Sequence, residues 1–178
     1  MDSPFVFLDF EASSLAQDSW PIELGMAWVD GQGLLVSCGC LIKPDPLWPE
    51  TAWWPASAAI HGIPRDALDR DGKTTQDAAD LFLTHIQGRI AVSDNPGFEA
   101  RWLQRLLDSA GTHPSEVVRI ADMDAVFART LQAAGLDTAW EYLERHRTPH
   151  RAEADARRMA QAWMRGLARD ASGQPSRP

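Results

Sequence analysis

The sequence predicts a single α/β domain built on a mixed five-stranded sheet, with an antiparallel meander as its first three strands and helices on both faces. Two observations predict this fold class. Three β-prone segments come first, and helical and β-prone segments then alternate along the rest of the 178 residues. Consecutive strands favour antiparallel pairing, whereas strands separated by helices favour parallel pairing, so one sheet should contain both kinds.

The first three strands lie close together in the chain. Residues 5–11 are β-prone with no clean alternation, as expected of a strand that is buried on both faces. Residues 22–29 are the second candidate strand, residues 30–33 are a turn, and residues 34–42 continue as the third strand. Residues 43–54 are rich in proline and tryptophan, which predicts an irregular surface loop.

Helices and strands alternate in the remainder. Residues 75–87 carry an apolar stripe at helical spacing, residues 89–93 are a short strand, and Pro96 begins a helix that ends near Ala110. A fifth strand is expected at residues 117–121. Three further helices are expected at about residues 123–134, 137–146 and 150–168.

Composition narrows the class of protein. Hydrophobic residues make up 44% of the chain, which argues against a disordered or fibrous protein. The formal charge of −8 argues against a protein that coats nucleic acid. However, residues 145–178 carry eight arginines against three acidic residues, and we expect phosphates to be held at this stretch.

The sequence also bears on the localisation of the protein and on its domain boundaries. No apolar run approaches the ~20 residues of a membrane span, and the first residues lack the basic region of a signal peptide. Cys38 and Cys40 are badly placed for a disulfide with each other, so we expect a reduced, cytoplasmic protein. The domain is expected over residues 1–170, and residues 171–178 as a disordered tail.

Asp9 and Glu11 stand at the carboxyl end of the first strand. Residues two apart in a strand point to the same face, so both carboxylates should project together where open α/β sheets place their sites. Two acids that follow a buried strand are costly to desolvate unless a positive charge neutralises them. The alternative is that the strand has left the core here and both acids are solvated.

His150 and Asp155 form a second candidate block. Five helical positions correspond to roughly 140° of offset, so the two side chains do not share one face of a continuous helix. Pro149 suggests that His150 precedes the helix and that Asp155 lies within it. A carboxylate on a helix and a histidine beside it suit a metal ligand and a movable base; an ordinary exposed histidine at a polar helix start is the alternative.

Residues 93–99 form the third block, a strand end followed by a helix start. Asp94 or Asn95 suits an N-cap, and a carboxylate in the first turn stabilises the helix dipole, so Asp94 needs no further explanation. Glu99 is explained only in part by this, because Phe98 and Trp102 indicate that the same turn packs against something.

Together the three blocks resemble the motifs of the DEDDh 3′→5′ exonucleases, of the DnaQ-like, ribonuclease H-like superfamily. Their order and spacing agree over about residues 4–165: an Asp-x-Glu, an Asn-x-x-Phe-acid block, and a His-x4-Asp. Residues 22–25 resemble the family's second strand, residues 59–63 its His-Gly-Ile loop, and residues 119–122 a strand that ends in Asp. The resemblance implies a ribonuclease H-like fold.

The resemblance also implies a two-metal hydrolase. Two Mg²⁺ or Mn²⁺ ions per active site would be held by Asp9, Glu11, Asp155 and Glu99, with Asp9 as the bridging ligand and Glu99 acting through water. His150 would be the general base that deprotonates the attacking water. The register of Asn95 and Phe98 selects Glu99 over Asp94 as the acid of the second motif.

The resemblance further implies contacts with the substrate. They are expected from Phe10, Ser13, Leu15, His61 and Phe98. Leu15 resembles a residue that wedges between the last bases, although core or loop packing is the alternative for Leu15, His61 and Phe98 alike. Trp53 and Trp54, in the expected loop, are further candidates for base stacking, whereas tryptophans in regular elements are expected in the core.

The activity implied is a metal-dependent 3′→5′ exonuclease that hydrolyses single-stranded DNA or RNA from the 3′ end, short oligonucleotides included, and releases 5′-nucleoside monophosphates. Ala12 and Ser14 depart from the usual residues, and Glu99 stands where the family has Asp. The alternative is therefore a catalytically weak, exonuclease-like module that binds nucleic acid or works with a polymerase or another nucleic-acid enzyme. Because many relatives are dimers, a homodimer is a further alternative.

Overall fold

A five-stranded sheet forms the centre of the molecule, and the computed structural model describes residues 3–112, 118–147 and 150–173. The strands are β1 (Phe5–Ala12), β2 (Pro21–Val29), β3 (Leu35–Leu41), β4 (Ile90–Ser93) and β5 (Ile120–Asp122). Their order is β3-β2-β1-β4-β5, with β1, β2 and β3 antiparallel and with β4 and β5 added in parallel beyond β1. The mixed sheet with its initial meander is therefore confirmed.

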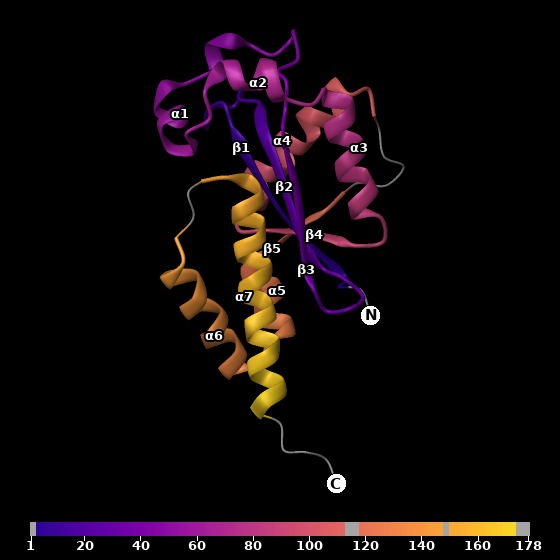
Figure 1. Ribbon diagram of the computed structural model, residues 1–178, viewed down its shortest axis with the longest axis vertical. Helices are drawn as coiled ribbons and strands as arrows, with labels where there is room; N and C mark the ends of the chain where they lie inside the picture. The colour runs from indigo at the N-terminus through magenta and orange to yellow at the C-terminus, as the bar shows by residue number, and fades with distance from the viewer. Residues whose placement is uncertain (1–2, 113–117, 148–149, 174–178) are drawn as a thin grey trace.

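Helices cover both faces of this sheet (Figure 1). They are α1 (Pro55–His61), α2 (Arg65–Asp71), α3 (Thr75–Ile86), α4 (Pro96–Ser109), α5 (Met123–Thr130), α6 (Ala133–Arg145) and α7 (Ala152–Gly173). α3 and α4 pack on one face, and α5, α6 and α7 pack on the other. α1 and α2 lie beyond one end of the sheet, next to the carboxyl end of β1 (Figure 1). No helix in the described part of the chain is long and apolar enough to cross a membrane.

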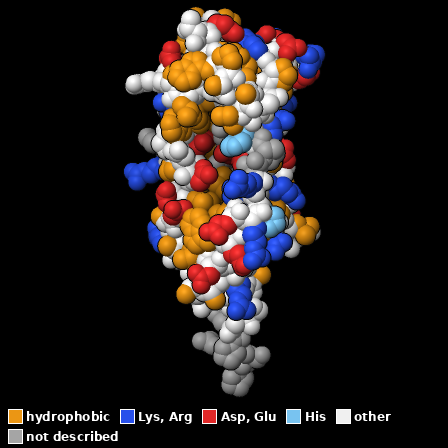
Figure 2. Space-filling view, turned by 90° about the vertical axis from the view of Figure 1, so that its left-hand side faces the viewer, with side chains coloured by type: hydrophobic (Ala, Val, Ile, Leu, Met, Phe, Trp, Pro, Cys, Tyr) orange, Lys and Arg blue, Asp and Glu red, His pale blue; other side chains and the backbone are white. Residues whose placement is uncertain are grey.

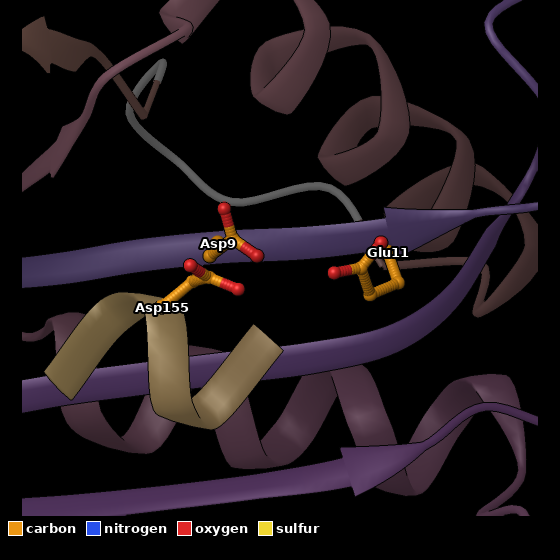
Figure 3. Close-up of side chains that lie close together, drawn as sticks. All are labelled: Asp9, Glu11 and Asp155. Carbon is orange, nitrogen blue, oxygen red and sulfur yellow. The ribbon is translucent and has the colours of Figure 1, made fainter. Parts of the chain in front are cut away.

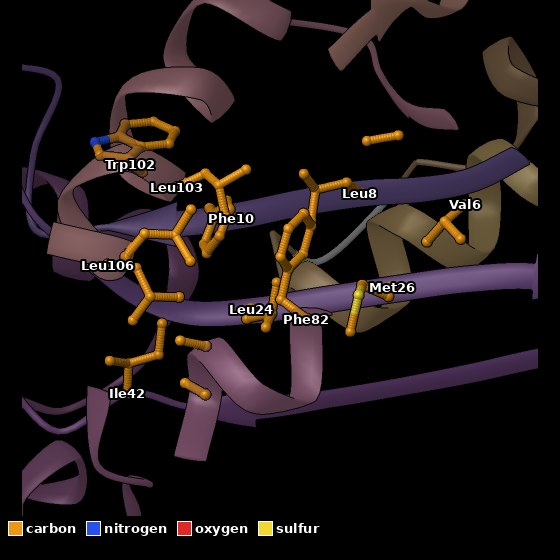
Figure 4. Close-up of a cluster of buried hydrophobic side chains, with 14 of the residues drawn as sticks. Val6, Leu8, Phe10, Leu24, Met26, Ile42, Phe82, Trp102, Leu103 and Leu106 are labelled. Carbon is orange, nitrogen blue, oxygen red and sulfur yellow. The ribbon is translucent and has the colours of Figure 1, made fainter. Parts of the chain in front are cut away.

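β1 is buried on both faces, as its composition predicts. Val6, Leu8 and Phe10 point into the cluster that includes Phe82 of α3 and Leu106 of α4 (Figure 4). The alternate residues of β1 point to the opposite face, where α5, α6 and α7 pack. This second face is apolar at the start of β1 and becomes acidic at its end, where Asp9 and Glu11 lie.

The predicted loop and the two short helices after it hold a third apolar cluster. Trp20 is fully buried, and it stacks on Trp48 and Trp53 with ring centroids 5.7 and 5.8 Å apart. The sequence did not predict α1 or α2. A seven-residue helix is marginal in isolation, so packing of this tryptophan cluster determines these helices more than local propensity does.

Helix boundaries differ from the prediction near the C-terminus. The helix expected at residues 123–134 ends at Thr130, and the next one begins at Ala133. The carboxylate of Asp170 accepts hydrogen bonds from the N–H groups of Gln132 and Gly135 at 2.7 and 2.8 Å, so a residue of α7 caps the start of α6.

The end of α7 and the start of β5 also differ from the expected boundaries. α7 continues to Gly173 and takes in the first three residues of the expected tail, while residues 174–178 lie outside the described part of the chain. β5 begins at Ile120, and the first residue of the strand expected there, at 117, is also outside the described ranges.

Candidate functional site

The site lies where β1 extends past its parallel neighbour. The pairing of β1 with β4 ends at Phe7, whereas β1 itself continues to Ala12. This separation leaves an open cleft of about 360 Å³ at the carboxyl ends of the two strands. The cleft is lined by Asp9, Phe10, Glu11, Leu15, Asp94, Asn95, Phe98, Glu99, Trp102, His150, Asp155 and Arg158.

Three carboxylates converge in the cleft. Asp9 and Glu11 project from the same face of β1, and Asp155 approaches them from the first turns of α7 (Figure 3). One oxygen from each of the three lies within 4.8 Å of the others. Hard divalent cations prefer clustered carboxylate oxygens of this kind, so the donor set fits Mg²⁺ or Mn²⁺.

Electrostatics in the cleft disfavour the charged forms of these acids. Burial, Asp155 and Glu23 raise the pKa of Glu11 to about 8, against a smaller opposing effect of Arg151. Burial raises the pKa of Asp9 well above its usual range, and Glu99 adds the largest repulsion from a neighbouring charge. The carboxylates therefore cannot all ionise at neutral pH without a compensating positive charge.

Glu99 is the buried acid beside this cluster. Its side chain is 3% exposed, and its Oε2 atom finds no hydrogen-bond partner among the described residues. Burial and then Asp94 raise its pKa, while a backbone hydrogen bond from Phe10 opposes the shift. Asp94 also lines the cleft, but it is exposed at the end of β4 and affects Asp9 least among the four neighbouring acids.

His150 lies at the rim of the same cleft, directly before α7. It is exposed, and its φ of 55° makes it the one non-glycine residue with a left-handed backbone in the described ranges. Such a conformation costs roughly 1–3 kcal/mol and is common at functional sites. Its position before the regular helix agrees with the role of Pro149 in the sequence prediction, although Pro149 itself lies outside the described residues.

A buried carboxylate that the sequence analysis did not single out holds the start of α7. Glu23 is 6% exposed and lies opposite Glu11 across the β1–β2 pair. It accepts hydrogen bonds from the Arg151 guanidinium, the shortest at 2.6 Å, and from the backbone N–H of Ala152 at 2.9 Å. The backbone N–H of Arg151 in turn donates to Asp155 Oδ2 at 3.1 Å. Because Glu23 is a charged residue within an otherwise apolar strand, the sequence did carry a signal for it.

Gly25 permits this close contact between α7 and the sheet. A Cβ atom at this position would lie 2.0 Å from the backbone carbonyl carbon of Ala152. The first turn of α7 thus packs directly against the backbone of β2, which brings Asp155 to the two acids of β1.

The predicted substrate-binding residues divide into two groups. Phe10, Leu15 and Phe98 line the cleft, and Leu15 is 64% exposed. Ser13 and His61 are buried and are not among the described residues that line it.

Ser13 and His61 both make contacts that hold the local backbone. The Ser13 hydroxyl accepts the N–H of Trp20 at 3.0 Å. Nδ1 of His61 accepts the N–H of Ile63 at 3.1 Å, and burial lowers the pKa of His61. An accepting Nδ1 places the proton of the neutral ring on Nε2, a buried atom with no hydrogen-bond partner among the described residues.

The tryptophans differ in how far they are exposed to solvent. Trp28, Trp102 and Trp163 are buried in the core, as predicted for regular elements, whereas Trp140 is half-buried at the edge of the second cluster. Trp53 packs on Trp20, whereas Trp54 is 46% exposed. Of the two candidates for base stacking, Trp54 is therefore the more accessible.

Comparisons with known proteins show structural similarity alone. No family model matches the chain, and no curated protein matches its sequence. The structure is similar to E. coli Exonuclease I in complex with a dT13 oligonucleotide, with a TM-score of 0.69 and 15% identity, and to a product-bound exonuclease I, with a TM-score of 0.68 and 14% identity. Each match covers 94% of this chain but only 42% and 44% of the exonuclease chains, respectively. The protein thus shares the fold of these exonuclease structures, and it spans less than half the length of their chains.

Proposed function

We propose that this protein is a metal-dependent 3′→5′ exonuclease that hydrolyses single-stranded DNA or RNA and releases 5′-nucleoside monophosphates. The observation that carries the proposal is the convergence of Asp9, Glu11 and Asp155 in an open cleft, with one oxygen of each within 4.8 Å of the others. The fold shared with structures of exonuclease I bound to oligonucleotides supports the same class of reaction.

Phosphodiester hydrolysis requires the charge arrangement that these residues supply. When two divalent cations are bound, they offset negative charge on the attacking and leaving oxygens of an in-line displacement. Four carboxylates balance the charge of two such cations. Asp9 would bridge them, Glu11 and Asp155 would complete the donor set, and Glu99 would act through water.

His150 would accept the proton of the attacking water. Its exposed position at the rim lets the imidazole contact both solvent and the cleft, and histidine is the side chain that most often serves as a general base. As the water oxygen bonds to phosphorus, the bond to the 3′ oxygen of the preceding nucleotide breaks, and that oxygen takes up a proton. Leu15 and Phe98 would contact the terminal nucleotide.

The activity is tested with single-stranded DNA and RNA oligonucleotides that carry a label at the 5′ end. With Mn²⁺ or Mg²⁺, the wild-type protein should shorten the labelled strand one nucleotide at a time, and chelator should abolish the reaction. Asp155→Asn and His150→Ala should each lower the rate by at least ~100-fold. Asp137→Asn, a control of the same charge change on the exposed face of α6, should leave the rate unchanged.

Metal binding is tested separately by thermal denaturation. Millimolar Mn²⁺ should raise the melting temperature of the wild type but not that of Asp155→Asn. Equal nucleotide release by wild type and His150→Ala would contradict the role of His150. Oligonucleotide binding without any release would favour the alternative, a catalytically weak module that binds nucleic acid.

A further inference from the structure

A second hollow, of about 250 Å³, lies beside the cleft between the end of α6 and the first half of α7. Its polar lining consists of Tyr142, His146, Arg147, Arg157, Arg158 and Gln161. No Asp or Glu among the described residues lines it. The face of the molecule on which α6 lies shows basic side chains gathered near its middle (Figure 2).

This absence of acids is unusual in a chain of net charge −8. Three guanidinium groups that share one small hollow repel one another unless an anion lies between them. Planar guanidinium groups match phosphate oxygens in geometry and charge. The chemistry therefore favours an anion with several negative charges over a single small one.

Arg158 connects this hollow to the active-site cleft. Its side chain lines both cavities. Its guanidinium donates hydrogen bonds to the backbone carbonyls of Leu143 and His146, the last turn of α6, so the side chain is fixed between the two cavities. An extended ligand can therefore pass from one cavity to the other along Arg158.

Further aromatic and cationic side chains lie on the surface next to this hollow. The rings of Tyr142 and His146 stack with centroids 4.0 Å apart. The Arg165 guanidinium lies 4.7 Å from the Tyr142 ring, and it lines an adjoining smaller hollow together with Arg145 and Glu141, which form an ion pair. Arg165 thus adds one positive charge beyond the hollow, whereas the charge of Arg145 is offset by Glu141.

We propose that this arginine hollow binds backbone phosphates of the strand whose 3′ end lies in the cleft, on the 5′ side of the bond that is cut. The inference rests on the proposed function, because a strand held there leads directly into the acidic site. The cleft would bind the end of the strand and the hollow its continuation. Binding should therefore strengthen with strand length up to the point where the hollow is filled.

The test replaces two exposed arginines that do not cap α6. The variant is Arg147→Gln/Arg157→Gln; within the described part of the chain, the Arg157 guanidinium donates a 3.2 Å hydrogen bond to the Ser37 hydroxyl. The matched control is Arg129→Gln/Arg169→Gln, which removes the same charge from exposed positions on α5 and at the far end of α7. Binding of fluorescein-labelled oligo-dT of 2 to 20 nucleotides is followed by anisotropy in chelator, over a series of salt concentrations.

The variant should bind dT20 at least ~10-fold more weakly than the control does. Its plot of log affinity against log salt should be shallower by about 1.4, because each phosphate contact on a single strand contributes a slope of about 0.7. The loss of affinity should be smaller for the dinucleotide, which is too short to span both cavities.

Three outcomes would overturn the inference: equal affinities of the variant and the control, a loss that is independent of strand length, or binding of polyglutamate in preference to oligo-dT. The third would identify an acidic protein segment as the ligand. If the wild type cleaves oligonucleotides and the two variants bind alike, the inference alone fails. If the wild type does not cleave but the variant loses length-dependent affinity, the proposed exonuclease function fails and the phosphate site stands.

Discussion

Glu11 offers a sharp test of the electrostatics of the acidic cleft. Its pKa is raised to about 8 from an ordinary value of 4.5, chiefly by burial and by Asp155. A carboxyl group whose pKa is raised on folding binds its proton more tightly in the folded state. Its contribution to stability is therefore present at low pH and is lost as the pH rises from about 4.5 to about 8.

The size of this loss follows from the shift. One pKa unit corresponds to 1.36 kcal/mol, so the loss in the free energy of unfolding reaches about 3 kcal/mol at pH 7, where Glu11 ionises mainly in the unfolded chain, and about 5 kcal/mol above pH 8. The change Glu11→Gln keeps the shape of the side chain and removes its charge. In the presence of chelator, the variant should therefore match the wild type at pH 4.5 and exceed its stability increasingly as the pH rises.

Urea denaturation between pH 4.5 and 8.5 measures the difference. Glu144→Gln, at an exposed position on α6, is the control and should differ from the wild type by less than about 0.5 kcal/mol at every pH. Addition of Mg²⁺ or Mn²⁺ should reverse the order, because the cation stabilises the folded wild type more than the variant that has lost a ligand.

Two results would refute this reasoning. One is a Glu11→Gln variant that is less stable than the wild type at pH 8.5 in chelator, and the other is a difference that does not change with pH. The second would show that Glu11 is solvated, the alternative that the sequence left open, and the first that its carboxylate makes a net favourable contact in the fold.

Further predictions concern the close approach of α7 to β2 and the packing of Trp53 and Trp54. Gly25→Ala should destabilise the protein by about 3 kcal/mol or more, because its Cβ would meet the backbone of Ala152, whereas Gly97→Ala, with no atom within 4 Å of the added Cβ, should leave the melting temperature unchanged or slightly higher. Trp53→Ala should lower the free energy of unfolding by about 3 kcal/mol, while Trp54→Ala should cost less than about 1 kcal/mol. If Trp54 stacks on a base, the same change should weaken oligo-dT binding by about 1–3 kcal/mol, and unchanged affinity in an anisotropy titration would exclude stacking.

Local patterns were sufficient for most of the sheet and for half of the acidic cluster. The run at residues 5–11 predicted a strand buried on both faces, and β1 packs against helices on both sides. The two-residue spacing of Asp9 and Glu11 placed both carboxylates on one face because side chains in a strand alternate. These predictions needed only the geometry of a single element.

Other features depend on contacts between residues that are distant in the sequence. The short helices α1 and α2 follow from packing around Trp20, and the start of α6 depends on a cap from Asp170. Spacing alone also could not show that Ser13 and His61 are enclosed in the interior, since their burial depends on the chain folded around them.

The acidic site also combines features that the sequence predicts with features that depend on contacts between distant residues. The sequence by itself determined which residue types could form a metal-binding, proton-accepting site, and their order along the chain. The resemblance placed Asp155 with Asp9 and Glu11, but only the tertiary structure decided how Asp155 reaches them, because α7 is anchored by Glu23 and approaches the sheet over Gly25. It also decided that Glu99 is buried beside them while Asp94 is exposed. The physical reason is that the repulsion and desolvation that distinguish these acids arise from distances across the fold, and a linear sequence does not contain those distances.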